Sequence, residues 1–88
     1  MLSQTGECAI KAVLELARSD PEDWVGARAL ASRLGMSPSY LAKIMQTLAH
    51  EGVLDSHRGN RGGFRLARSA TRISLLDVVA PFDDLTPG

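Results

Sequence analysis

The residues best suited to chemistry in this chain are arginines set among glycines in one short stretch. Arg58, Arg61 and Arg65 fall within eight residues, interleaved with glycine and asparagine. A guanidinium group presents a fork of N–H donors that matches phosphate oxygens. Glycine and asparagine tolerate positive φ, so the stretch suits the tip of a β-hairpin. The pattern predicts a basic hairpin able to straddle phosphates or to reach into the minor groove of a duplex.

A second group of polar side chains falls on one face of a predicted helix over residues 38–51. Apolar residues at helical spacing predict its buried stripe, which is Leu41, Ile44, Met45 and Leu48. The opposite face holds Ser39, Lys43, Gln46 and His50, with Tyr40 and Thr47 beside it. This face has no carboxylate before Glu51, whereas a merely solvated helix face usually carries both signs of charge. It is therefore suited to a surface that approaches phosphate.

A helix-turn-helix is predicted immediately before this face. Residues 26–34 read as a helix, and Gly35 ends it because glycine tolerates the left-handed conformation found past a helix C-terminus. Ser37 is a good N-cap for the next helix. Pro38 follows at the first helical position, where its missing N–H costs nothing. This turn brings two helices together, and the second can enter a major groove, where each base pair shows distinct donors and acceptors.

The remaining segments complete a winged helix-turn-helix, mainly α with a small β-hairpin. Helices are expected at Ser3–Ser19, with a core stripe of Ile10, Val13, Leu14 and Ala17, and at Thr71–Ala80, with Ser74 as N-cap. Strands are expected at Val53–His57 and Gly63–Ala67, and a frayed tail from Asp83 to Gly88. Residues 1–88 are interpreted as one domain, with a recognition helix at about 38–51 and a wing at about 53–68.

The net charge is zero, but it is unevenly distributed along the chain. The segment 24–76 holds eight basic and two acidic residues, a net of +6. The segments on either side each carry a net of −3. Such asymmetry can focus a positive field on one surface. The alternative is that the arginines simply keep a small hairpin soluble.

Composition argues against several other classes of protein. No apolar run approaches the roughly 20 residues of a membrane span, and no signal peptide is evident. The lone Cys8 forms no internal disulfide and favours a buried apolar role and a cytoplasmic protein. His50 and His57 lack partner ligands at zinc spacing, so no metal site is predicted. No nucleophile–base pair or cofactor fingerprint indicates an enzyme.

Four motifs resemble the N-terminal domain of the Rrf-type redox and iron–sulfur regulators, the group of IscR and NsrR. The motifs are Leu34–Leu41, Gly52–Leu54, Arg58–Ala67 and Ile73–Val79. The resemblance covers nearly the whole chain. It implies a dimeric bacterial transcription factor, a repressor rather than an enzyme, that reads a palindromic operator in double-stranded DNA.

The resemblance also implies roles for individual residues. Ser39 and Tyr40 match positions that contact bases or phosphates, and Arg58 matches an arginine that enters the minor groove. A further contact position falls on Ala42, which can offer only an apolar contact to a thymine methyl. Together with the residue patterns, this predicts a DNA-binding set of Ser37, Ser39, Tyr40, Lys43, Gln46, Thr47, Arg58, Arg61 and Arg65.

Two family features are missing from these 88 residues. Members commonly continue into a loop of three cysteines that holds an iron–sulfur cluster, and then into a long dimerisation helix. The chain stops where that loop would begin, which indicates either a fragment or a reduced member. Glu7 matches an acidic residue that completes the cluster in some members, but it has no cluster to bind here. No cofactor is expected in this chain, and a cluster only in a longer form.

A protein-interaction module is the main alternative to a DNA-binding regulator. Winged helices also serve as docking domains, because a fold does not determine a function. The broad apolar surface of the first helix favours docking, although it suits a homodimer interface equally well. Binding to DNA at low salt would discriminate between the two interpretations.

Overall fold

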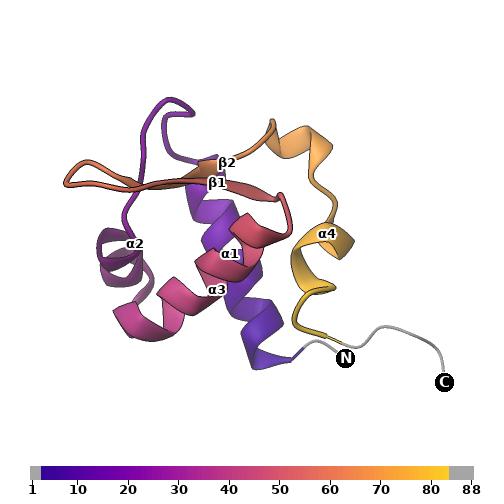
Figure 1. The fold of residues 1–88 in the computed structure, drawn as a ribbon. Coiled ribbons are helices and arrows are strands. Elements are labelled where there is room, and N and C mark those ends of the chain that lie inside the picture. Colours follow the sequence, from indigo (N-terminus) through magenta and orange to yellow (C-terminus); the bar gives the residue numbers. More distant parts are fainter. Residues whose placement is uncertain (1–2, 84–88) are drawn as a thin grey trace, which may run out of the picture.

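The chain folds in the order helix, helix-turn-helix, hairpin and short helix in a computed structural model, which describes residues 3–83 (Figure 1). The helices are α1 (Gln4–Ala17), α2 (Ala27–Leu34), α3 (Pro38–His50) and α4 (Leu75–Val79). The strands are β1 (Leu54–His57) and β2 (Gly63–Leu66). The predicted class, mainly α with a small antiparallel hairpin, is therefore confirmed.

The turn between α2 and α3 forms as predicted. Gly35 has a φ of 67°, in the left-handed region that favours glycine. The Ser37 hydroxyl accepts a hydrogen bond from the backbone N–H of Tyr40, and Pro38 occupies the first turn of α3. This local chemistry positions α3 against α2.

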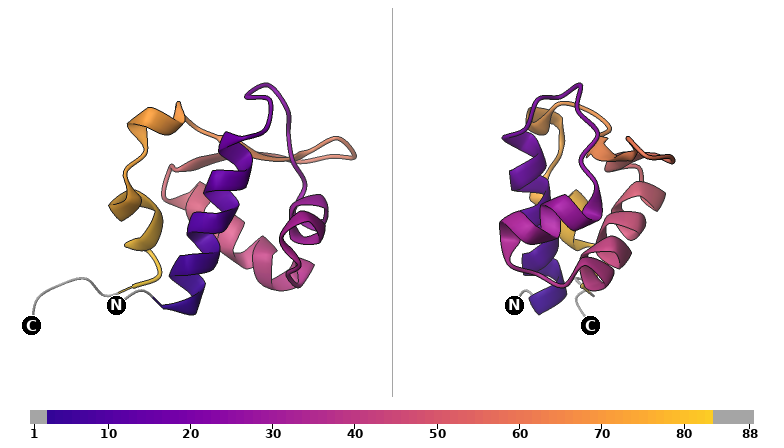
Figure 2. Two further views of the ribbon diagram at one scale, coloured as in Figure 1. Left: turned by 180° about the vertical axis from the view of Figure 1, so that it is seen from behind. Right: turned by 90° about the vertical axis from the view of Figure 1, so that its left-hand side faces the viewer.

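The core is built mainly on one stripe of α3. Leu41, Ile44, Met45 and Leu48 are all buried, as predicted, together with Leu30 of α2. Because α3 buries this stripe, its opposite face is turned outward. Seen from behind, in the left view of Figure 2, α1 crosses in front of α3, so that α1 covers the inner side of α3.

The predicted core stripe of α1 is only partly correct, because Val13 is buried and Ile10 packs against the core, but Leu14 and Ala17 do not face it. The buried residues are Ala9, Ala12, Val13 and Leu16, whereas Leu14 is 58% exposed and Ala17 is exposed. Apolar residues lie on more than one side of α1, so periodicity alone does not select the buried face. The small side chains of Ala9 and Ala12 are wholly buried, which favours close packing of α1 on its neighbours.

The hairpin gains a third, unpredicted pairing partner. Leu54 pairs with Leu66, and Ser56 pairs with Phe64, in an antiparallel register. Val25, in the loop between α1 and α2, forms an antiparallel bridge with Phe64 on the other edge of β2. The loop is thereby attached to the wing, which extends past α2 on the left of Figure 1.

The last helix is shorter than predicted, because the first residues of the predicted helix form a separate turn. Residues 70–72 form a separate 3-10 turn, and α4 begins only after Ser74. Ser74 is the N-cap, as predicted, and forms a capping box with Asp77. Asp83 is not frayed, since its carboxylate accepts a hydrogen bond of 2.9 Å from the backbone N–H of Ser3. Residues 84–88 of the predicted tail lie outside the described residues.

Arg68 joins the end of the wing to α4. Its guanidinium donates to the carbonyl oxygens of Arg72 and Gly52, at 2.9 and 3.0 Å, and to the carboxylate of Asp77 at 3.1 Å. Hydrogen bonds from the backbone and hydroxyl of Ser74, and then from Arg68, hold the pKa of Asp77 below its ordinary value. Both effects favour the ionised carboxylate.

We expect Asp77→Asn to lower the melting temperature slightly at neutral pH. Because the pKa of Asp77 is lower in the folded chain, its stabilisation is present above the ordinary carboxyl value and is lost as pH falls through the folded value. The gap in melting temperature between wild type and variant should therefore close in acid. Thermal denaturation across pH measures this, with the exposed Asp23→Asn as control. A gap that is constant with pH would contradict it.

Candidate nucleic-acid interface

The outer face of α3 presents the polar residues that its spacing predicts. Ser39, Lys43, Gln46 and His50 are exposed, whereas Ala42 and Thr47 are partly buried. The Thr47 hydroxyl donates to the carbonyl oxygen of Lys43, at 3.0 Å. A threonine hydroxyl has a single O–H donor, and in Thr47 this bond inside the helix uses it. The freer groups on this face are therefore the hydroxyl, ammonium, amide and imidazole of the four exposed residues.

The N-terminus of α3 collects three hydroxyl groups. The Ser37 and Ser39 hydroxyls lie 3.1 Å apart, and the Tyr40 hydroxyl lies 2.9 Å from the hydroxyl of Thr5 on α1. Tyr40 is 38% exposed. Unpaired backbone N–H groups and the helix dipole make this end favourable for an anion such as phosphate. Thr5, which positions the Tyr40 ring, carries no spacing signal that sequence reasoning could have used.

The wing tip carries two exposed arginines, Arg58 and Arg61. The turn between them is closed by a hydrogen bond of 3.0 Å from the Gly62 N–H to the Gly59 carbonyl oxygen. A Cβ at Gly62 would clash with the His57 carbonyl oxygen, so only glycine fits this turn. The tip therefore presents guanidinium groups on a tightly folded backbone.

A hollow of about 560 Å³ lies between α3 and the wing, and candidate residues from both elements line it. Gln46, Ala49 and His50 line it from α3, and Arg58 lines it from the wing. The side chains of Gln46, His50 and Arg58 can all donate hydrogen bonds, and no carboxylate lines this hollow. The geometry is suited to a polyanionic strand lying between the recognition helix and the wing tip.

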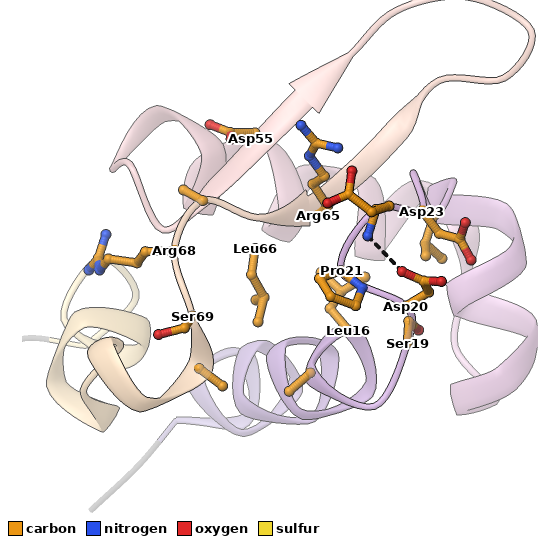
Figure 3. A pocket seen from close by; sticks show the side chains of 15 residues that line it. Leu16, Ser19, Asp20, Pro21, Asp23, Asp55, Arg65, Leu66, Arg68 and Ser69 are labelled. Carbon is orange, nitrogen blue, oxygen red and sulfur yellow. Dashed lines mark hydrogen bonds between the residues drawn. The ribbon is translucent and has the colours of Figure 1, made fainter.

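Arg65 lies away from that hollow. Its guanidinium is 4.1 Å from the centroid of the Trp24 ring. Figure 3 shows Arg65 and Leu66 leaving β2 in opposite directions, with Leu66 pointing toward α1. Arg65 lines a separate hollow of about 460 Å³ that also includes Asp20, Asp23 and Asp55. Of the nine predicted site residues, Arg65 is the one that shares a hollow with these three carboxylates.

Two other basic residues of the positive segment serve the fold. Arg33 lies 3.9 Å from the carboxylate of Glu15, and Arg68 is held by Asp77 at 3.1 Å. Lys43, Arg58 and Arg61 make no ion pair within residues 3–83. The charges of Lys43 on α3 and of Arg58 and Arg61 at the wing tip are therefore not neutralised by an ion pair within these residues, which favours a negatively charged partner.

The contact of Trp24 with His57 in the wing was not predicted from the sequence. Their rings stack with centroids 5.1 Å apart and an interplanar angle of 24°. The adjacent Trp24-Val25 pair, both residues with high β-propensity, is a signal that could have indicated a third strand.

The described residues do not fit an iron–sulfur cluster. Such a cluster needs several cysteine thiolates, and the chain has only Cys8, which is partly buried on α1. Within residues 3–83 no three His, Cys, Asp or Glu side chains lie close enough to hold a metal ion. Glu7 lies in the first turn of α1, where its charge favours the positive end of the helix dipole.

The comparison with known families decides the relationship. The model for the iron-dependent transcriptional regulator family Rrf2 matches residues 2–86. The chain belongs to the Rrf2 family. Among curated members, the regulator BadM of Rhodopseudomonas palustris is 37% identical over 83 residues, which are 94% of this chain and 53% of BadM. The regulator IscR of Xenorhabdus nematophila is 34% identical over 83 residues, 94% of this chain and 51% of that protein.

Solved structures of two regulators have the same fold. IscR of T. potens superposes with a TM-score of 0.84 at 28% identity, over 100% of this chain and 64% of that one. CymR, the global cysteine regulator of B. subtilis, shares the fold with a TM-score of 0.91 at 24% identity, over 100% and 69%. The expected winged helix-turn-helix is therefore confirmed, as is a regulator family rather than an enzyme.

The chain spans about half the length of the curated relatives that it matches. In the part of the chain that the structure covers, no helix is both long and apolar enough to cross a membrane.

Proposed function

We propose that residues 1–88 act as the single DNA-binding domain of a dimeric transcriptional repressor. Residues 38–51 are its recognition helix and enter the major groove of a palindromic operator. Residues 53–68 are its wing, and Arg58 enters the adjacent minor groove. The observation that carries this proposal is the hollow between α3 and the wing, around which Gln46, His50 and Arg58 meet without a carboxylate.

The proposed contacts divide into two kinds. Ser37, Ser39 and Tyr40 hold the N-terminus of α3 on the phosphates, and Lys43 adds a charge to the same strand. Gln46 and Thr47 face base edges, where an amide can pair with adenine through two hydrogen bonds. Arg61 neutralises phosphate at the wing tip, and Arg65 adds positive charge beside the wing from its place over the ring of Trp24.

A homodimer is the proposed assembly in the full-length protein. Leu14, Leu75 and Leu76 are each more than half exposed, and an apolar hollow lies between α1 and α4. Exposed apolar surface of this kind is typical of an interaction site. The same observation favours the second candidate function, a protein-interaction module that does not bind DNA.

Fluorescence anisotropy of the chain with a labelled duplex library, across a salt series, tests the proposed function. We expect affinity to fall steeply with salt, because phosphate contacts release counterions. We expect the selected duplex to be a palindrome that binds two chains, read from a stoichiometric titration. A folded sample without affinity at low salt would support the interaction module instead.

Arg58→Ala should weaken binding to the selected duplex about tenfold and reduce its preference for an A·T-rich flank, since a narrow A·T minor groove attracts arginine. The melting temperature should not change, because the Arg58 side chain is exposed. Arg72→Ala is the matched control, because Arg72 is exposed and belongs to the 3-10 turn of residues 70–72, which Figure 1 shows on the opposite side of the molecule from the wing tip. Equal affinities of the two variants would remove Arg58 from the site.

A further inference from the structure

The loop between α1 and α2 is hydrogen-bonded to the wing. The Val25 N–H donates to the Phe64 carbonyl oxygen at 2.9 Å, and the Phe64 N–H donates to the Val25 carbonyl oxygen at 2.8 Å. These two bonds occupy the edge of β2 that β1 leaves free. The base of the wing is therefore part of a three-stranded arrangement, whereas its tip is not.

The antiparallel register of this bridge sets Trp24 opposite Arg65 on β2. The Trp24 ring contacts the Arg65 guanidinium at 4.1 Å and also stacks on the His57 ring at 5.1 Å. One indole thus contacts both strands of the wing, on the face turned away from Leu54 and Leu66. Cation–π and stacked aromatic contacts of this kind favour one orientation of the rings.

The wing tip has little support of its own. Residues 58–61 are exposed, and the backbone bond from Gly62 to Gly59 is the one hydrogen bond that closes the tip within the described residues. A two-stranded hairpin alone is only marginally stable in water. The direction of the tip therefore depends on contacts at its base, and His57, on which Trp24 stacks, directly precedes Arg58.

We propose that Trp24 is a positioning residue that orients the wing tip and so determines how well Arg58 reaches DNA. The inference rests on the proposed function, in which Arg58 contacts the minor groove. Trp24 acts through the wing, by holding His57 and Arg65 together across it. The Trp24 ring itself does not line the hollow between α3 and the wing.

A double-mutant cycle between Trp24 and Arg58 tests this inference on the selected duplex. Trp24→Leu should weaken binding about fivefold in the wild-type background and less than about 1.5-fold in Arg58→Ala, because the two residues act through one contact. Phe82→Leu is the control, since Phe82 packs against the core from the α4 side. Its effect should be the same in both backgrounds. Equal effects of Trp24→Leu in the two backgrounds would overturn the inference and leave the proposed function standing.

Hydrogen exchange provides a readout that does not depend on DNA. The Phe64 amide, which donates to Val25, should exchange about threefold to tenfold faster in Trp24→Leu and should be unchanged in Phe82→Leu. Unchanged exchange in Trp24→Leu would overturn the inference, even if wild-type protein bound no duplex and the proposed function failed. Should Trp24→Leu not fold, His57→Ala removes one stacked partner and enters the same cycle and exchange measurement.

Discussion

Replacing Gly63 with alanine is expected to lower the free energy of unfolding by about 3 kcal/mol. Gly63 has a φ of 154°, which residues with a side chain rarely adopt, so alanine at this position strains the backbone. Its new Cβ would also clash with the backbone of Val25 and would lie 2.7 Å from the Gly26 nitrogen. The bridge between Val25 and Phe64 must then open, because the obstructing atoms are backbone and cannot rotate away.

Thermal denaturation measures this loss, with Gly59→Ala as the matched control. Gly59 also has a positive φ, of 119°, but a Cβ there meets nothing within 4 Å. Gly59→Ala should therefore cost only its strain, about 1–2 kcal/mol. In a domain of this size, 3 kcal/mol corresponds to a fall of roughly 12 °C or more in Tm. Equal melting temperatures for the two variants would show that close packing of the loop on the wing does not stabilise the domain.

The helix-turn-helix could be predicted because its chemistry is local. Gly35 tolerates the left-handed conformation, Ser37 caps the next helix, and Pro38 fits its first turn. Each preference acts within a few residues of the turn. The buried stripe of α3 was predicted for a similar reason, since only one face of that helix is apolar.

The face that α1 buries could not be predicted from its own residues. Leu14 and Leu16 lie on different sides of the helix, and either side is apolar enough for a core. The choice is made by packing, which buries the small Ala9 and Ala12 and leaves Leu14 half out of the core. Helical periodicity specifies a stripe only where the opposite face is polar.

The candidate site was predictable in its members and only partly in its arrangement. The polar residues of α3 and the arginines of the wing tip follow from spacing, but their meeting around one hollow depends on how the wing lies over α3. Arg65 shows the limit of alternation along a strand. Alternation correctly places the Arg65 side chain on the opposite face from Phe64 and Leu66. It does not reveal that Trp24, about forty residues earlier in the chain, covers the Arg65 guanidinium.

The two faces of α3 should respond differently to alanine, because one supports the fold and the other is proposed to read DNA. Leu48 is fully buried, so Leu48→Ala removes core packing and leaves a cavity. We expect it to cost about 2–5 kcal/mol, a large part of the stability of so small a domain. Thermal denaturation should show a much lower Tm, and DNA binding should fall only as the folded fraction falls.

Gln46→Ala is the matched change on the outer face of the same helix. Gln46 is exposed and alanine is the better helix former, so the free energy of unfolding should stay within about 0.5 kcal/mol of the wild-type value. Affinity for the selected duplex should nevertheless fall about tenfold, because an amide that pairs with a base edge is lost. Loss of stability in Gln46→Ala, or unchanged affinity in a fully folded sample, would contradict the proposal that this face of α3 reads base pairs.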